Sequence, residues 1–180
     1  MRPLIVLALF STVAFATPAT PLPRGDDQFQ LGMSMTEIDS TLSANNVEIL
    51  SRGFDYITAA GPPGVDFVEY RFAITPDWPS RLWRVTTAYP APYRREDFDG
   101  VRGTLEGLLG QPSEVKHPSP KSGDPEERVT WADPLTAVQL GARWVEPQDP
   151  QIDRMVVTWT DRKLQKVVET QRRKQKQHGK

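Results

Sequence analysis

Residues 29–42 read FQLGMSMTEIDSTL, and this stretch marks where the chain begins to fold. Ser34 and Glu37 have the spacing of a capping box, in which the serine hydroxyl accepts a hydrogen bond from the third helical amide while the glutamate reaches back to the serine amide. Ile38 and Leu42 follow at helical spacing. A catalytic serine would need a base, and no histidine lies nearby in the sequence. The stretch therefore predicts a helix that begins after Ser34, with Ser34 and Glu37 as its structural cap.

Four strands are predicted after this first helix. β-branched and aromatic residues gather in short runs between glycine and proline clusters, which is the pattern of strands joined by turns. These runs lie at 45–50, 54–60, 65–74 and 81–89.

The second half of the chain shows the same order of elements. A helix is predicted over 95–109, because apolar residues recur there at helical spacing and Gly110 then ends it. Its apolar residues are Phe98, Val101, Leu105, Leu108 and Leu109. Four strands are again predicted, at 113–117, 127–132, 135–145 and 152–160.

This order predicts one α+β domain over residues 29–161, with an antiparallel sheet of about eight strands and helices on one face. It divides into two helix-plus-four-strand halves, about 29–92 and 93–161. No repeat is visible residue by residue, so the predicted duplication is one of pattern only.

The N-terminus has the features of a secretory signal peptide over residues 1–16. Arg2 precedes a short apolar run, and Ala14-Phe15-Ala16 has the form of a cleavage site. The alternatives are an uncleaved anchor and a buried first strand; the run is shorter than the roughly 20 residues that a spanning helix needs. We therefore expect no transmembrane span and a periplasmic or secreted protein after cleavage near Ala16. A flexible, proline-rich leader is predicted over 17–28.

The protein has no cysteine, which excludes disulfides, a thiol nucleophile, a thiolate metal site and a cysteine-linked lipid. An exported, cysteine-free protein of this size suits the bacterial periplasm better than it suits a small disulfide-stapled secreted fold. A basic tail is predicted over 162–180, where Glu169 alone opposes a run of cations, while the preceding part of the protein is acidic. The simpler interpretation of this tail is a solvated segment that keeps the protein in solution.

Two short motifs suggest a family. The stretch LGMSMTEI (31–38) resembles the helix start of small bacterial envelope domains, namely the SmpA/OmlA-type lipoprotein component of the outer-membrane barrel-assembly machine and the related β-lactamase-inhibitor-protein fold. LLGQP (108–112) resembles the helix end of such domains. The second of these folds is a tandem helix-plus-four-strand repeat in one curved eight-stranded sheet. The resemblance implies a non-enzymatic envelope protein that works by binding.

Familiar catalytic and metal-binding patterns are missing from the sequence. His117 and His178 neighbour neither a plausible nucleophile nor a second metal ligand. The stretch DFDG (97–100) imitates the start of an EF-hand loop, but its glycine comes too early and the later ligands are absent. No catalytic residue, metal or cofactor is therefore assigned. A carboxylate pair brought together by folding stays open, because sequence spacing does not reveal it.

The strands indicate one candidate surface. Side chains alternate across a strand, so the apolar residues fix the inward face. The predicted inward residues are Val68, Tyr70, Phe72 and Ile74, then Trp83, Val85 and Tyr89, then Val129, Trp131, Val138, Leu140, Trp144, Met155, Val157 and Trp159. The outward face then holds five arginines: Arg71, Arg84, Arg128, Arg143 and Arg154. Thr86, Thr130 and Thr158 join them.

Two interpretations of this surface are open. Arginine and threonine are ordinary solvent-facing strand residues, often paired with acids such as Glu69. Alternatively, the arginines bind a carboxylate-bearing or otherwise anionic partner. We expect an exported binding protein whose partner is an unknown protein or an anionic envelope component, and no nucleic acid. The alternative function is an envelope enzyme that uses buried carboxylates.

Overall fold

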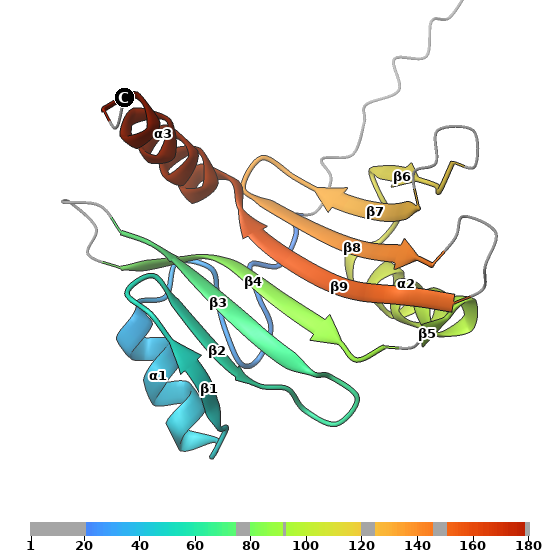
Figure 1. The fold of residues 1–180 in the computed structure, drawn as a ribbon, viewed down its shortest axis with the longest axis horizontal. Coiled ribbons are helices and arrows are strands. Elements are labelled where there is room, and N and C mark those ends of the chain that lie inside the picture. Colours follow the sequence, from blue (N-terminus) through green and yellow to red (C-terminus); the bar gives the residue numbers. More distant parts are fainter. Residues whose placement is uncertain (1–20, 75–79, 92, 120–124, 146–150, 179–180) are drawn as a thin grey trace, which may run out of the picture.

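The computed structural model describes residues 21–74, 80–91, 93–119, 125–145 and 151–178 (Figure 1). The elements of the first half are α1 (Met35–Ala44), β1 (Ile49–Arg52), β2 (Tyr56–Ala60), β3 (Phe67–Ala73) and β4 (Arg81–Tyr89). Those of the second half are β5 (Tyr93–Arg94), α2 (Arg95–Leu109), β6 (Glu114–Lys116), β7 (Glu126–Ala132), β8 (Thr136–Trp144), β9 (Gln151–Asp161) and α3 (Arg162–His178).

All strands belong to one antiparallel sheet in the order β1-β2-β3-β4-β9-β8-β7-β6, and the two-residue β5 pairs with β9 beside this path. The predicted α+β class is confirmed. The last strand of the first half, β4, pairs with the last strand of the second half, β9, so the two strand meanders join at the middle of the sheet.

The helix α1 begins as its capping box predicts. The Glu37 amide donates to the Ser34 hydroxyl over 3.2 Å, and the Ser34 amide donates to the Glu37 carboxylate over 2.6 Å. The hydrogen bonds from the backbone and the side chain of Ser34 lower the pKa of Glu37. Gly32 makes the turn into the helix at φ +100°, a conformation that side-chain-bearing residues rarely adopt.

The core lies on one face of the sheet, here called the inner face, which α1 and α2 cover. Ile38 of α1 and Phe98 of α2 are both buried there, and Figure 1 shows α2 behind β8 and β9. Of the predicted inward tryptophans, Trp131, Trp144 and Trp159 are buried in this core. The opposite face is called the outer face.

Trp83 was predicted to point inward, and this prediction is wrong. The pairing of β3 with β4 shifts by one residue, because Phe72 faces Leu82 whereas Arg71 faces Arg84. Trp83 is the extra residue of this β-bulge, and a bulge breaks the simple alternation of side chains. It packs instead with Ala73 and α3, in a cluster separate from the main core. Ile74 lies just beyond β3 and is 37% exposed rather than inward.

The basic tail forms the helix α3, far longer than the one or two turns that its few apolar residues suggest. Asp161 caps this helix, because its carboxylate accepts the amides of Lys163 at 2.8 Å and Leu164 at 2.9 Å. Leu164 and Val168 are buried against Trp83. A third helix therefore packs against the outer side of the β3–β4 hairpin, and beyond it α3 extends away from the sheet (Figure 1).

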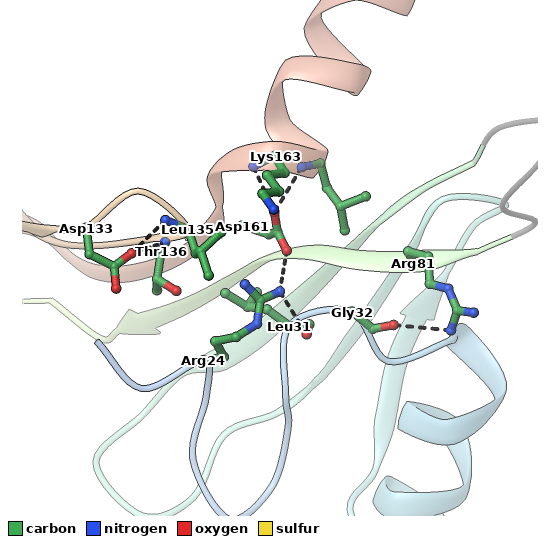
Figure 2. A network of polar contacts seen from close by, with 10 residues as sticks. Arg24, Leu31, Gly32, Arg81, Asp133, Leu135, Thr136, Asp161 and Lys163 are labelled. Atoms are coloured by element: carbon green, nitrogen blue, oxygen red, sulfur yellow. Dashed lines mark hydrogen bonds and ion pairs between the residues drawn. The ribbon is translucent and has the colours of Figure 1, made fainter. Parts of the chain in front are cut away.

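Part of the segment assigned to a flexible leader is packed on the fold. The Leu22 amide donates to the Asp133 carboxylate over 2.7 Å. Arg24 forms an ion pair with Asp161 and also donates to the Leu31 carbonyl over 3.3 Å (Figure 2). Asp161 thus joins the N-terminal segment to the start of α3. The predicted signal peptide lies outside the described residues.

Candidate binding surface on the outer face of the sheet

The strand register places all five predicted arginines on the outer face. Arg71 and Arg84 lie directly opposite each other on β3 and β4. Arg143 and Arg154 form a similar opposed pair on β8 and β9. Arg128 of β7 lies opposite Gly141 of β8, two residues before Arg143 and so on the same face.

These arginines form two groups rather than one patch. The arginine pair is Arg71 and Arg84; the arginine triplet is Arg128, Arg143 and Arg154. Arg84 faces Thr160 on β9, and Arg154 lies six residues earlier on that strand. At about 3.3 Å per residue, the two groups are roughly 20 Å apart along β9.

Carboxylates accompany four of the five arginines. Glu69 lies 2.8 Å from Arg71, and Glu126 lies 3.1 Å from Arg128 and 3.8 Å from Arg154. Asp153 lies 4.0 Å from Arg143. These side chains are partly exposed, so each ion pair contributes only about 0–1 kcal/mol to stability.

Small and polar side chains occupy the sheet between the two groups. Thr86 and Thr158 face each other across β4 and β9, and the next row of the same face holds Ala88, Val156 and Gly141. Apart from Gln139, which lies opposite Thr158, the side chains at the centre of the outer face are therefore shorter than the arginines toward both ends. A small hollow of about 130 Å³ lies beside the triplet, lined by residues that include Arg128, Arg154, Gly141 and Val156.

The inner face carries a larger hollow, of about 500 Å³, between α2 and the N-terminal segment. Its lining is mostly apolar and aromatic, and includes Phe29, Tyr70 and Trp159. Burial raises the pKa of Tyr70 to about 12. Asp26 and Asp27 line it too, and the Asp26 carboxylate accepts the amides of Gln28 and Phe29 at 2.8 and 3.1 Å.

The structure also brings together a group that sequence reasoning missed. Glu127 of β7 is only 1% exposed, and its carboxylate lies 2.8 Å from the Arg95 guanidinium and 3.3 Å from His117 Nδ1. Arg95 lies over the Trp144 ring, 4.2 Å from its centroid. Although these distances are short, neither carboxylate oxygen accepts a well-aligned hydrogen bond in the described part of the protein. The signal in the sequence that could have revealed this group is Glu127 itself, a charged residue at an inward-facing position of its strand.

Glu127, Arg95 and His117 are interpreted as a structural ion cluster. His117 Nδ1 lies 3.3 Å from the Glu127 carboxylate without a hydrogen bond between them, and the contacts described place no nucleophile beside them. Among residues 21–74, 80–91, 93–119, 125–145 and 151–178, no three histidine, aspartate or glutamate side chains are grouped so that they could hold a metal ion. Within the same ranges, no helix is long and apolar enough to cross a membrane.

The fold and this surface define the class of protein: an α+β domain with a helix-covered inner face and an arginine-bearing outer face. Comparison with protein-family models, with curated proteins and with solved structures finds no match. The resemblance to SmpA/OmlA-type and β-lactamase-inhibitor-like domains therefore stays a prediction.

Proposed function

We propose that this protein is an exported, non-enzymatic envelope protein that binds an anionic partner through the outer face of its sheet. The observation that carries the proposal is the placement of five arginines on that single face. The mostly short side chains at its centre leave room for a partner to approach the sheet, with arginines available toward both ends. Guanidinium groups suit carboxylates because they offer two parallel hydrogen bonds.

The neighbouring carboxylates do not argue against this function. Exposed ion pairs contribute little to stability, so a partner's carboxylates can replace Glu69, Glu126 or Asp153 at small cost. The same acids offset part of the mutual repulsion among the four arginines that they accompany. The hollow of the inner face has two neighbouring acids, Asp26 and Asp27, and Asp26 is engaged in holding the backbone of the N-terminal segment.

The binding proposal is tested with a fluorescent hexaglutamate peptide and fluorescence anisotropy. We expect the double variant Arg128→Gln/Arg154→Gln to fold normally and to bind the peptide about tenfold more weakly. Binding should also weaken as salt rises, since screening acts over about 10 Å at 0.1 M ionic strength.

The rival source of such binding is the basic part of α3. Its matched control is Arg173→Gln/Lys174→Gln/Lys176→Gln, which keeps the buried Leu164 and Val168 in place. Loss of peptide binding in this control, with full binding by the double variant, would overturn the proposal.

Export is tested separately. Mass spectrometry of the protein from its native envelope should find a mature form that begins at Thr17. An intact segment 1–16 would instead make the protein an anchored one.

A further inference from the structure

The Arg84 guanidinium lies half-buried where β4 meets α3. It stacks on the Trp83 ring, 4.3 Å from the centroid. Its Nε is buried without a hydrogen-bond partner, and in the described part of the protein no carboxylate lies within ion-pair distance of it. Guanidinium groups carry five donors and are ordinarily paired when buried. Arg84 is thus the one member of the five outer-face arginines that lacks an acidic partner among the described residues.

The helix α3 brings a second arginine to the same place. Leu164 and Val168 are buried against the sheet, and Arg172 follows Val168 by four residues, on the same stripe of the helix. The Gln171 side chain donates to the Ile74 carbonyl over 3.2 Å, which holds this turn of α3 beside the end of β3. Burial lowers the pKa of Arg84, and the charges of Arg172 and Arg71 lower it further.

The carboxylates around Arg84 already have other partners. Arg71 and Glu69 face it from β3, and Arg172 and Glu169 face it from α3. Glu69 is already engaged by Arg71 over 2.8 Å, and Glu169 accepts a hydrogen bond from Gln165 over 2.9 Å. Arg71 also pairs with Asp55 at 3.9 Å, so the acids around Arg84 are engaged by Arg71 and Gln165, and none of them pairs with Arg84 itself.

We propose that Arg84 and Arg172 together bind a single carboxylate group, held between the outer face and α3. This inference rests on the proposed function, because it names the point at which the anionic partner is anchored. A bound carboxylate supplies the acidic partner that Arg84 lacks, and its two oxygens can accept from both guanidinium groups. It also separates two like charges that otherwise face each other. An acidic side chain, the C-terminus of a polypeptide and a small organic acid all supply this group.

Such a site combines the outer face of the sheet and the basic helix α3, which are the two candidate anion-binding parts of the molecule. The sheet supplies Arg84, and the basic helix supplies Arg172. A bound carboxylate therefore holds α3 more firmly against β3 and β4, so ligand binding should also slow the opening of that helix.

The test follows the Arg84 Nε–H signal by NMR during titration with sodium acetate, at ionic strength held constant with sodium chloride. A buried Nε–H exchanges slowly with water and gives an observable signal. We expect a saturable shift with acetate, weakened about tenfold in Arg172→Gln, which corresponds to loss of one charge-assisted hydrogen bond. Arg143→Gln, a matched change in the triplet, should leave the titration unchanged.

Three results would overturn this inference: no saturable shift with acetate, an unchanged titration in Arg172→Gln, or tighter binding of inorganic phosphate than of acetate. The variant Glu169→Gln tests the opposite direction: because it removes a nearby carboxylate, it should tighten acetate binding. Thermal unfolding of each variant confirms that it is folded.

The source of the carboxylate is distinguished with hexaglutamate peptides that carry a free or an amidated C-terminus. Equal perturbation of Arg84 by both identifies acidic side chains, and perturbation by the free form alone identifies a polypeptide C-terminus. The same peptide-binding measurements distinguish failure of this inference from failure of the proposed function. If Arg84→Lys and Arg172→Gln keep full peptide binding while Arg128→Gln/Arg154→Gln loses it, the outer face is the binding surface but this anchor is not.

Discussion

At the scale of single residues, Ser34 shows how a short motif fixes where the fold begins. Its hydroxyl donates a hydrogen bond to the Glu37 carboxylate over 2.7 Å and accepts one from the Glu37 amide. The Ser34 hydroxyl and the Glu37 carboxylate are therefore both engaged at the start of α1. Met35, the next residue, is tied to Ser80 by a hydrogen bond of 3.0 Å from its amide. The start of α1 is therefore also held beside the residue that precedes β4.

We expect Ser34→Ala to lower the free energy of unfolding by about 1 kcal/mol, because the Glu37 amide loses its acceptor. Urea denaturation measures this loss. Binding of the hexaglutamate peptide should be unchanged, since Ser34 lies outside the arginine pair and the arginine triplet. Unchanged stability with lost binding would show that the hydroxyl has a functional rather than a structural role.

A second residue-scale prediction concerns the buried Glu127. Arg95→Ala leaves its carboxylate without its nearest cation; because Arg95 is 42% exposed and water screens the site, we expect a loss of about 2 kcal/mol rather than the 3–5 kcal/mol typical of a fully buried pair. The double variant Arg95→Met/Glu127→Leu should lie within about 1 kcal/mol of the wild type.

Chemical denaturation of the three proteins decides whether this ion cluster is structural. Equal destabilisation by the single and the double variant would mean that packing, rather than the unpaired charge, accounts for the loss.

At the scale of elements, the alternation and helical periodicity of the sequence predicted the eight principal strands and the first two helices. The strand-face assignment held for the five arginines because each lies next in sequence to a residue of its own strand that is buried in the inner core: Tyr70, Val85, Val129, Ala142 or Met155. It failed at Trp83, because a one-residue bulge leaves no mark in an apolar-polar pattern. The Glu127–His117 contact was also beyond prediction, since it joins a strand to the residue after β6 through tertiary packing.

The extent of α3 could have been predicted. Glutamine, lysine, arginine and glutamate are good helix formers, and Asp161 precedes the segment as a cap. Leu164 and Val168 also have helical spacing. The run of cations in the same segment instead favours a solvated tail, which is why one was predicted from the sequence.

We expect Leu164→Ala to lower stability by about 2 kcal/mol, because it removes a buried side chain from the cluster around Trp83. Amide hydrogen exchange should show faster opening of residues 165–172, while the central strands stay protected. Lys166→Ala, at an exposed position of the same helix, is the control and should change neither quantity. Uniformly faster exchange across the sheet would show that α3 is part of the global folding unit instead.

At the scale of the whole molecule, the sheet separates two environments. Its inner face is covered by α1 and α2 and holds the main core, while its outer face presents arginines, threonines and small side chains. Only α3 packs against the outer side, at the β3–β4 end, within the part of the protein that the structure describes. The central claim is that this outer face binds an anionic partner.

Methyl NMR during titration with the hexaglutamate peptide tests that claim most directly. Val156 and Val157 are neighbours on β9, but Val156 belongs to the outer face and Val157 to the inner core. Outer-face binding predicts that the Val156 methyl signals shift with peptide concentration while those of Val157 stay in place. Shifts of Val157 without Val156, or shifts confined to α3, would contradict it.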